Sequence, residues 1–259
     1  MLTISVLLFA SLLYSQSKFD INNLIDRGGL KYAPNDDEPY AGKVFDFYEN
    51  GQKKLDGRYR KGLMNGKWTY YHENGQFHAQ GRFIDGDGSN PHESSGIPFN
   101  GRSGRWSFWY KNGQKSSEDN YKDGKRDGKY TTWYENGQKS GEGTFKNGIL
   151  IGKYEWWFED GTKEWEYYYN DDGTRDSTKL TIRWYENGQK QFEGYWKNTD
   201  DTTSVWIGKH TVWYENGQKW YEGTFKNGKQ DAIWTWWYEN GQKWKEGTFK
   251  NGELDGKWT

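Results

Sequence analysis

The chain has 259 residues, and aromatic residues alone make up 19% of it against 32% for all hydrophobic residues. Leu, Ile, Val and Ala are therefore scarce, and a close-packed aliphatic core is not expected. The formal net charge is −1 with acids and bases interspersed, so no basic stripe favours nucleic acid as a partner. Cysteine is absent, which excludes disulfides, a thiolate nucleophile and cysteine-ligated zinc.

The first element along the chain is an apolar run from Leu2 to Tyr14, followed by small and polar residues. The run matches the h-region of a secretory signal and is shorter than the roughly 20 residues of a membrane-spanning helix. We predict a signal peptide over residues 1–17, cleaved after Ser15, Gln16 or Ser17, and a secreted, periplasmic or cell-surface protein. A buried N-terminal strand and a true start further upstream are the alternatives, with a cytoplasmic location in place of export. No other transmembrane segment is expected.

Residues 18–41 are interpreted as a lead-in with half of a repeat, and residues 42–259 as an array of eight repeats. One phrase, YENGQK, occurs five times, and three blurred copies lie between these. The glycines of the eight phrases are separated by 24, 38, 24, 24, 27, 29 and 24 residues. A unit of 24 residues with insertions near 84–101, 170–180 and 199–205 explains these steps. The glycines are Gly51, Gly75, Gly113, Gly137, Gly161, Gly188, Gly217 and Gly241.

The phrase predicts the tip of a β-hairpin. Asn-Gly or Asp-Gly between residues of high β propensity is the strongest short hairpin signal, because both central residues of a type I′ turn need positive φ. A second turn follows eleven residues later in several units, as in Lys146–Gly148. Each unit is then two short antiparallel strands with a turn at either end. The predicted fold is all-β, with tandem antiparallel hairpins of about 24 residues forming one elongated, twisted, single-layer sheet.

Two columns of the repeat are always aromatic. One lies four residues before the reference glycine, and the other lies eight residues after it. If the loop has two residues, Trp68 lies opposite Gly81 and Trp234 opposite Gly247, so that large rings cover glycines across the ladder. The first column then lies on the other face of the sheet, beside Thr, Glu and Lys. It contains Trp109, Trp133, Trp157, Trp184, Trp213 and Trp237.

The residue three after the reference glycine varies freely among the repeats, and it is Trp220 and Trp244 in the last two. In the two-residue-loop register this variable residue lies opposite the tryptophan column. A fixed ring beside a variable neighbour is what a modular recognition surface would look like. An exposed, unconstrained position is the alternative.

Units such as GKYTTWYENGQKSGEGTFKNG, at Gly128–Gly148, resemble the MORN repeat variant of many bacterial proteins, often catalogued as YwqK-type antitoxins of toxin–antitoxin systems. The resemblance covers about Gly42 to Thr259, and the lead-in Gly29–Val44 is similar to the half-unit that often precedes such arrays. It implies hairpins in an elongated sheet and a role in protein interaction or surface display, and it supplies no catalytic residues. A secreted member fits an antitoxin role poorly, because a toxin acting in the cytoplasm needs its antidote there. The departures from the family phrase are His72 and Phe77 in the second unit and Asp160 and Thr162 in the fifth.

No pattern in the sequence favours catalysis. An acidic column recurs in seven units and could supply paired carboxylates for glycoside hydrolysis, but a catalytic pair should break a repeat pattern. His72, His78, His92 and His210 lack a tight metal-ligand spacing and are expected to be scattered surface histidines. The segment Asp85–Asn90 begins like a calcium loop but lacks the glycine and glutamate that such a loop requires, which favours a turn-rich insertion. We expect no enzyme activity, no metal and no cofactor.

A row of Trp beside polar side chains, on a sheet face that stays accessible, suits a partner protein or sugar rings. The sequence therefore predicts a non-enzymatic secreted or cell-envelope repeat protein that offers an interaction or scaffold surface to a protein partner. A cell-envelope glycan-binding module is the first alternative, and an antitoxin or immunity protein is the second. The candidate binding residues are Trp133, Trp157, Trp184, Trp213, Trp237, Trp220 and Trp244.

Overall fold

The computed structural model describes residues 19–259 except residues 94 and 200–202. The predicted signal peptide over residues 1–17 lies outside the described residues, so it stays a prediction. In the described part of the chain, no helix has the length and apolarity needed to cross a bilayer.

The regular structure of the described residues consists of β-strands and one short 3₁₀-helix, η1 (Ile21–Asn23). The lead-in contributes β1 (Phe19–Asp20), β2 (Ile25–Arg27) and β3 (Leu30–Tyr32). The first four repeats contribute β4 (Gly42–Phe47), β5 (Lys53–Arg60), β6 (Leu63–Tyr71), β7 (Phe77–Gly86), β8 (Arg102–Trp109), β9 (Lys115–Lys122), β10 (Lys125–Trp133) and β11 (Lys139–Lys146). The remainder contributes β12 (Ile149–Trp157), β13 (Lys163–Tyr169), β14 (Thr181–Trp184), β15 (Lys190–Asn198), β16 (Ser204–Trp213), β17 (Lys219–Lys226), β18 (Lys229–Trp237), β19 (Lys243–Lys250) and β20 (Glu253–Leu254).

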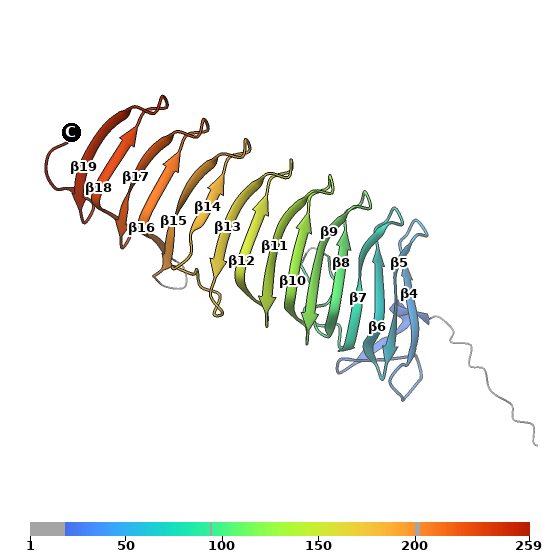
Figure 1. Ribbon diagram of the computed structural model, residues 1–259. Coiled ribbons are helices and arrows are strands. Elements are labelled where there is room, and N and C mark those ends of the chain that lie inside the picture. The colour runs from blue at the N-terminus through green and yellow to red at the C-terminus, as the bar shows by residue number, and fades with distance from the viewer. Residues whose placement is uncertain (1–18, 94, 200–202) are drawn as a thin grey trace, which may run out of the picture.

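Among the described residues, one sheet of 18 strands runs from one end of the array to the other. Strand β1 pairs in parallel with β4, and each strand from β4 to β19 pairs antiparallel with the next strand along the chain. Strands β2 and β3 form a separate hairpin. Figure 1 shows the hairpins standing side by side in a long open row, with β4 near one end and β19 near the other. The predicted all-β fold of tandem hairpins in one elongated sheet is confirmed.

The tip of each hairpin differs from the expected type I′ turn. In the first unit the Gly51 N–H donates to the Tyr48 carbonyl oxygen at 2.9 Å, and the Tyr48 N–H donates to the Gln52 carbonyl oxygen at 2.8 Å. The loop therefore has three residues, of which Gly51 has a φ of 80° while Asn50 has no positive φ. The Asn50 Oδ1 atom accepts the Gln52 N–H at 2.9 Å, which favours a type I turn followed by a left-handed glycine. The predicted type I′ turn is wrong here.

The register along the strands is nevertheless the predicted one. Phe47 pairs with Lys53, but Asp46 pairs with Leu55, so that a β-bulge at Lys54 follows directly after the loop. The third loop residue shifts the strand pairing by one residue, and the bulge residue shifts it back by one. Beyond the bulge, side chains therefore face the same sides, and have the same partners, as in a hairpin with a two-residue loop. The pairs Trp68–Gly81 and Trp234–Gly247 are therefore confirmed.

Type I′ turns occur instead at the opposite edge of the array. Asn147 and Gly148 have φ values of 52° and 87°, and Lys146 pairs with Ile149 across the two-residue loop. The Gly148 N–H donates to the Arg126 carbonyl oxygen of the preceding hairpin at 2.7 Å, so this turn also joins neighbouring units. The two turns of this unit, Asn136-Gly137 and Asn147-Gly148, thus have different geometries although both contain Asn-Gly.

The bulge changes the position of the variable residue. Trp237 pairs with Lys243, and Trp244 is the extra residue of the bulge. The Trp244 ring lies on Tyr238, with centroids 5.8 Å apart, and Trp220 likewise lies 5.7 Å from Tyr214. The prediction that Trp220 and Trp244 lie opposite the tryptophan column is therefore wrong. The bulge turns both side chains to the other face of the sheet.

The buried core lies on one face of the first repeats only. We call this side of the sheet the aromatic face. The lead-in and the segment between β7 and β8 cover it there, and Phe19, Leu24 and Phe99 pack on the core. After Tyr121, the buried hydrophobic side chains of the described residues are only Val212 and Trp234. The core residues are Val44, Tyr59, Met64, Trp68, Ala79, Phe83, Ile97, Trp106 and Tyr121.

Candidate functional site

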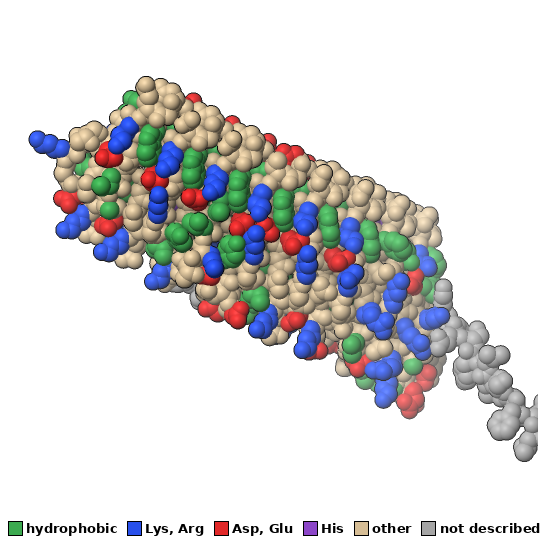
Figure 2. Space-filling model, viewed as in Figure 1, with side chains coloured by type: hydrophobic (Ala, Val, Ile, Leu, Met, Phe, Trp, Pro, Cys, Tyr) green, Lys and Arg blue, Asp and Glu red, His purple; other side chains and the backbone are tan. Residues whose placement is uncertain are grey.

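The tryptophan column forms a ladder with lysines and acids on the face opposite the core. The Lys139 Nζ atom lies 5.0 Å from the centroid of Trp157 in the next unit and 2.7 Å from Glu142 Oε2. Partial burial raises the pKa of Glu142, but hydrogen bonds from Lys139 and Lys129 outweigh it and hold this pKa below its usual value. Figure 2 shows hydrophobic, basic and acidic side chains repeating in rows along the array. The lysines over rings in the next unit are Lys53, Lys115, Lys139, Lys163, Lys190 and Lys219.

Five of the predicted binding residues lie in this ladder. We call these five rings the tryptophan ladder: Trp133, Trp157, Trp184, Trp213 and Trp237. Each ring is half-buried and has a lysine ammonium over it. Such cation–π contacts contribute about 0.5–1 kcal/mol at exposed sites. The ladder therefore stabilises the stack of hairpins, and the ammonium groups cover ring surface that a sugar would need.

The repeated phrase itself joins successive units. The Tyr134 hydroxyl donates to the Trp157 carbonyl oxygen at 2.7 Å, and the Asn136 amide donates to the Glu159 carbonyl oxygen at 2.8 Å. Equivalent bonds connect most other tips, for example between Tyr214 and Trp237 at 3.0 Å. Tyr, Asn, Gly and Lys of the phrase therefore each have a structural role.

The aromatic face beyond β9 has no covering segment from the described part of the chain. Apart from the buried Trp234 and His210, its rings are half-buried or exposed, and basic side chains lie on several of them. The Arg175 guanidinium lies 3.8 Å from the Tyr167 ring centroid, Arg183 lies 4.7 Å from Trp165, and Lys245 lies close to several rings. We call this surface the free aromatic face. It comprises Tyr130, Phe145, Tyr154, Trp156, Trp165, Tyr167, Phe192, Trp206, Trp220, Tyr221, Trp236, Trp244 and Trp258.

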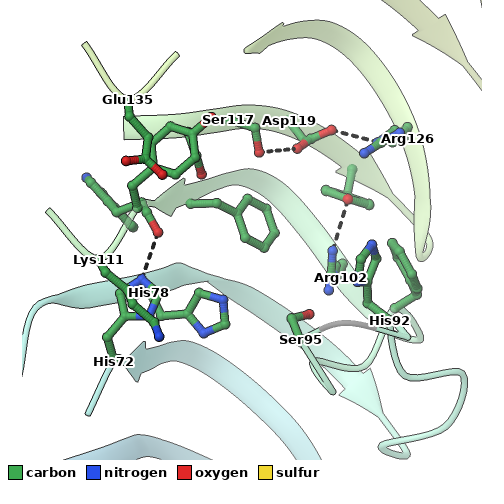
Figure 3. A pocket seen from close by; sticks show the side chains of 16 residues that line it. His72, His78, His92, Ser95, Arg102, Lys111, Ser117, Asp119, Arg126 and Glu135 are labelled. Atoms are coloured by element: carbon green, nitrogen blue, oxygen red, sulfur yellow. Dashed lines mark hydrogen bonds and ion pairs between the residues drawn. The ribbon is translucent and has the colours of Figure 1, made fainter. Parts of the chain in front are cut away.

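A cavity of about 480 Å³ lies where the covered half of the aromatic face meets the free half. Figure 3 shows His72 and His78 side by side at one end, and the Asp119–Arg126 pair at the other. The two imidazole rings stack with centroids 4.5 Å apart, and His72 Nε2 lies 2.9 Å from the Trp109 carbonyl oxygen. Burial, with a smaller contribution from His72, lowers the pKa of His78 to about 4. His78 is therefore neutral at pH 7.

Asp119 is a buried acid in the wall of this cavity, with 1% of its surface exposed. Arg126 Nε lies 2.6 Å from Asp119 Oδ1, and the Ser117 hydroxyl donates to Asp119 Oδ2 at 3.3 Å. Burial raises the pKa of Asp119 above its usual value in spite of the opposing effect of Arg126. The pair is therefore costly to bury, since removing charges from water is only partly offset by their attraction.

Arg102 is buried in the same wall, also with 1% exposure. Its guanidinium donates to the carbonyl oxygens of Pro98 at 2.7 Å and Ile97 at 3.0 Å, and to the Tyr121 hydroxyl at 2.9 Å. It also lies 4.2 Å from the Phe99 ring centroid. Burial lowers the pKa of Arg102 from its usual value. Arg102 fixes the segment before β8 on the sheet.

The histidines are not scattered over the surface as expected. His72 and His78 meet in the cavity, and His210 is 4% exposed among the rings of Phe192, Trp206, Tyr221 and Phe225. Within the described residues, no group of three His, Cys, Asp or Glu side chains is arranged to hold a metal ion. The departure of His72 from the phrase was the sequence signal for this cavity, whereas Phe77 lies on the other face beside Trp109. Only the fold brings His72 and His78 close to the segment before β8.

The fold and these surfaces define an open β-hairpin repeat protein. Six segments match the family model described as "MORN repeat variant", namely residues 64–85, 102–123, 126–147, 179–198, 207–227 and 230–251. The chain therefore carries MORN-variant repeats. No match covers 148–178, which contains the divergent phrase at Asp160 and Thr162. No curated protein matches the chain.

Two solved structures are similar to the chain at a low level. They carry the titles "Crystal Structure of TcdB2-TccC3" and "Crystal Structure of TcdB2-TccC3-Cdc42", with sequence identities of 9% and 11%. The alignments cover 87% and 88% of this chain, with TM-scores of 0.20 and 0.18. The chain spans only 14% of the length of each of those chains. Neither likeness bears on function.

Proposed function

We propose that the protein is a non-enzymatic, exported scaffold that holds a protein partner on its free aromatic face. The observation that carries the proposal is the unequal covering of one continuous sheet face. Its first part is buried under the chain's own segments, whereas most rings beyond β9 remain half-buried or exposed, with Trp234 and His210 the buried exceptions among the described residues. Repeats of the MORN kind commonly serve as interaction modules, which agrees with this assignment.

The part of the aromatic face that the chain's own segments cover indicates what kind of partner would fit the free aromatic face. In the covered part, an extended lead-in and the segment before β8 place Phe19, Leu24, Ile97 and Phe99 on the sheet. A partner segment that lies across the free face in the same way needs apolar side chains to contact the rings. Basic groups stand over these rings, and buried nitrogens of Arg175 and Arg183 lack a hydrogen-bond partner in the described part of the chain. Acidic groups between the apolar ones would pair with them, so we propose an extended acidic-apolar segment of a partner protein.

Export is part of this proposal and rests on the apolar run from Leu2 to Tyr14. N-terminal sequencing of the protein from its native host should find a start between Gln16 and Lys18. Intact Met1 in a soluble cytoplasmic pool would contradict export. Together with rescue of cells from a toxin encoded nearby, that result would favour the antitoxin or immunity function instead.

Glycan binding is the second candidate, and it is favoured by the exposure of two tryptophans on the free aromatic face. Trp220 and Trp244 are 44% and 50% exposed, and each lies beside a tyrosine of the repeated phrase. Exposed rings of this kind suit stacking on a sugar. A saturable glycan-array signal that is lost when both residues are changed to Ser would support this function over protein binding.

The decisive experiment compares two faces of the same protein. A partner captured from envelope extract is identified, purified and titrated against wild type and the double variant Trp220→Ser, Trp244→Ser. Binding should weaken about tenfold, because exposed aromatic residues act as anchors at interfaces. The variant Phe77→Ser is the matched control, since Phe77 is 45% exposed and lies beside Trp109 of the tryptophan column. Equal affinity of the double variant and wild type, with loss in the control, would move the binding surface to the tryptophan ladder.

A further inference from the structure

The cavity in Figure 3 lies where the repeat pattern is broken by charged residues. Arg102 and Arg126 each pair with the aromatic residue eight after a reference glycine, and in the flanking units the residues in this place are Met64 and Leu150. Asp119 occupies the position that is glycine in the units on either side, Gly81 and Gly143. Three neighbouring positions that are neutral in the flanking units thus carry charge here, whereas in the rest of the array the arginine position is charged at Arg175, which pairs with Tyr169.

The geometry of the hairpins does not require these charges. Met64 and Leu150 fill the arginine position in hairpins of the same geometry, and glycine fills the aspartate position. Taking a charge out of water costs several kcal/mol per ion, and hydrophobic residues of similar volume are often at least as stabilising. Arg102, Asp119 and Arg126 are costly to bury, and together they lie in the wall of one cavity. This combination indicates a binding role.

The charges around the cavity favour an anion. Among the lining residues, three cations (Arg102, Arg126 and Lys111) face two acids (Asp119 and Glu135), so the arginine, lysine and acid side chains sum to a formal charge of +1. Asp119 is engaged by Arg126, and Arg102 forms no ion pair within the described residues. Its buried positive charge is held only by neutral oxygens and aromatic rings. An anionic ligand would supply the counter-charge.

The remaining walls favour a ring in the ligand. The rings of Phe99 and Phe108 line the cavity, and the neighbouring His78 ring has no hydrogen-bond partner in the described part of the chain. A planar or cyclic skeleton can lie against these rings, while imidazole and guanidinium groups donate to its oxygens. The volume of about 480 Å³ is within the range of small-molecule sites.

We propose that this cavity binds a small ring compound that carries a carboxylate, with Arg102 and Arg126 holding the carboxylate and the aromatic wall holding the ring. The ligand is either a free organic acid or an acidic sugar within a polysaccharide. The site is separate from the free aromatic face, so it can be present whether or not a protein partner binds there.

Isothermal titration of the full chain tests the proposal with benzoate, galacturonate and polygalacturonate, and with benzamide and inorganic phosphate as controls. Benzoate or galacturonate should bind, while benzamide, which lacks the charge, and phosphate, which lacks the ring, should bind at least about tenfold more weakly. Binding of the free acids alone assigns a small metabolite, and binding of polygalacturonate as well assigns a polysaccharide. No heat from any carboxylate, or equal affinity for phosphate, would overturn the proposal.

Three variants separate binding from folding. Arg102→Met, which copies Met64, should lower carboxylate affinity at least about tenfold, whereas Asp119→Asn should raise it, because a repelling charge is removed. If both residues were merely structural, the two substitutions would not be expected to change carboxylate affinity in opposite directions. Arg175→Gln, an arginine of the same face outside the cavity, should leave affinity unchanged. A fall in affinity in both cavity variants, or an equal fall for Arg175→Gln, would refute the site.

Discussion

The contact between glycine and tryptophan across the ladder provides a sharp test of how the array is held together. An alanine methyl group at Gly81 would lie 2.1 Å from Trp106 Cδ2 and 2.2 Å from Cε2. Carbon atoms in contact are about 3.5 Å apart, so the indole ring would have to withdraw by about 1.4 Å. Trp106 is 0% exposed, so the ring has no solvent-filled space to enter.

The expected cost of Gly81→Ala follows from this geometry. Overpacking a core costs typically about 1–3 kcal/mol. Moving the ring also weakens the hydrogen bond from the Trp106 indole N–H to the Arg82 carbonyl oxygen, 3.1 Å long, which contributes about 1 kcal/mol. We expect a loss of about 3 kcal/mol in the free energy of unfolding. Gly141→Ala is the control: its methyl group would lie 2.7 Å from the Thr132 hydroxyl oxygen and 3.0 Å from the half-buried Trp156 ring, both of which can move, and we expect a loss of about 1 kcal/mol.

The assay is guanidinium unfolding followed by far-UV circular dichroism for wild type, Gly81→Ala, Trp106→Leu and the double variant. Because repeat arrays can unfold in more than one step, hydrogen exchange of the β7 and β8 amides should accompany it. In the Trp106→Leu background the alanine should cost less than about 1 kcal/mol, since the indole ring is gone. An equal cost in both backgrounds would refute the reasoning, because the strain would then come from the backbone.

Three further predictions concern single positions. Ala232 has a φ of 61° at the repeat position where Gly152 has a φ of 65°. Ala232→Gly should therefore stabilise the protein and Gly152→Ala should destabilise it, by about 1 kcal/mol each in urea unfolding. A stability change of the same sign in both variants would contradict this. Burial lowers the pKa of His210 to about 4 from about 6.5 in the unfolded chain, so its stabilising effect is complete above pH 6.5 and is lost as pH falls toward 4. His210→Phe should therefore reduce the loss of stability between pH 7 and pH 4.5 by about 2–3 kcal/mol, and an unchanged pH profile would show that the imidazole does not titrate in the fold. Tyr134→Phe removes the 2.7 Å bond to the Trp157 carbonyl oxygen and should cost about 1 kcal/mol in thermal unfolding, and no change in melting temperature would show that water replaces it.

The turns show what the repeated phrase could predict about the structure and what it could not. Asn-Gly correctly predicted a hairpin tip at each phrase, and the rings opposite glycines correctly predicted the register of Trp68 with Gly81. The loop type was wrong because Asn-Gly permits two outcomes. At Asn50 the side chain accepts the Gln52 N–H and favours a type I turn, whereas Asn147 adopts positive φ. The choice depends on hydrogen bonds to neighbouring hairpins, since the Asn50 amide also donates to the next unit at Glu73.

The sequence could not reveal the bulge, and this error moved two candidate binding residues to the wrong face. A three-residue loop plus one bulge gives the same register as a two-residue loop. The hydrophobic pattern along the strands is therefore identical in both cases, and only the residue at the bulge differs. Trp220 and Trp244 are at that position, which is why they lie with Tyr214 and Tyr238.

By itself, the sequence determined the period of the array, the hairpin in each unit and the aromatic columns, because these depend on residues a few positions apart and recur in every unit. The tertiary structure alone decided which part of the aromatic face is covered and where the cavity lies. Those features arise where the lead-in and the segment before β8 fold back on the sheet and bring His78, Arg102 and Asp119 together. Contacts of this kind join residues far apart in the chain at a single place, so no repeat pattern encodes them.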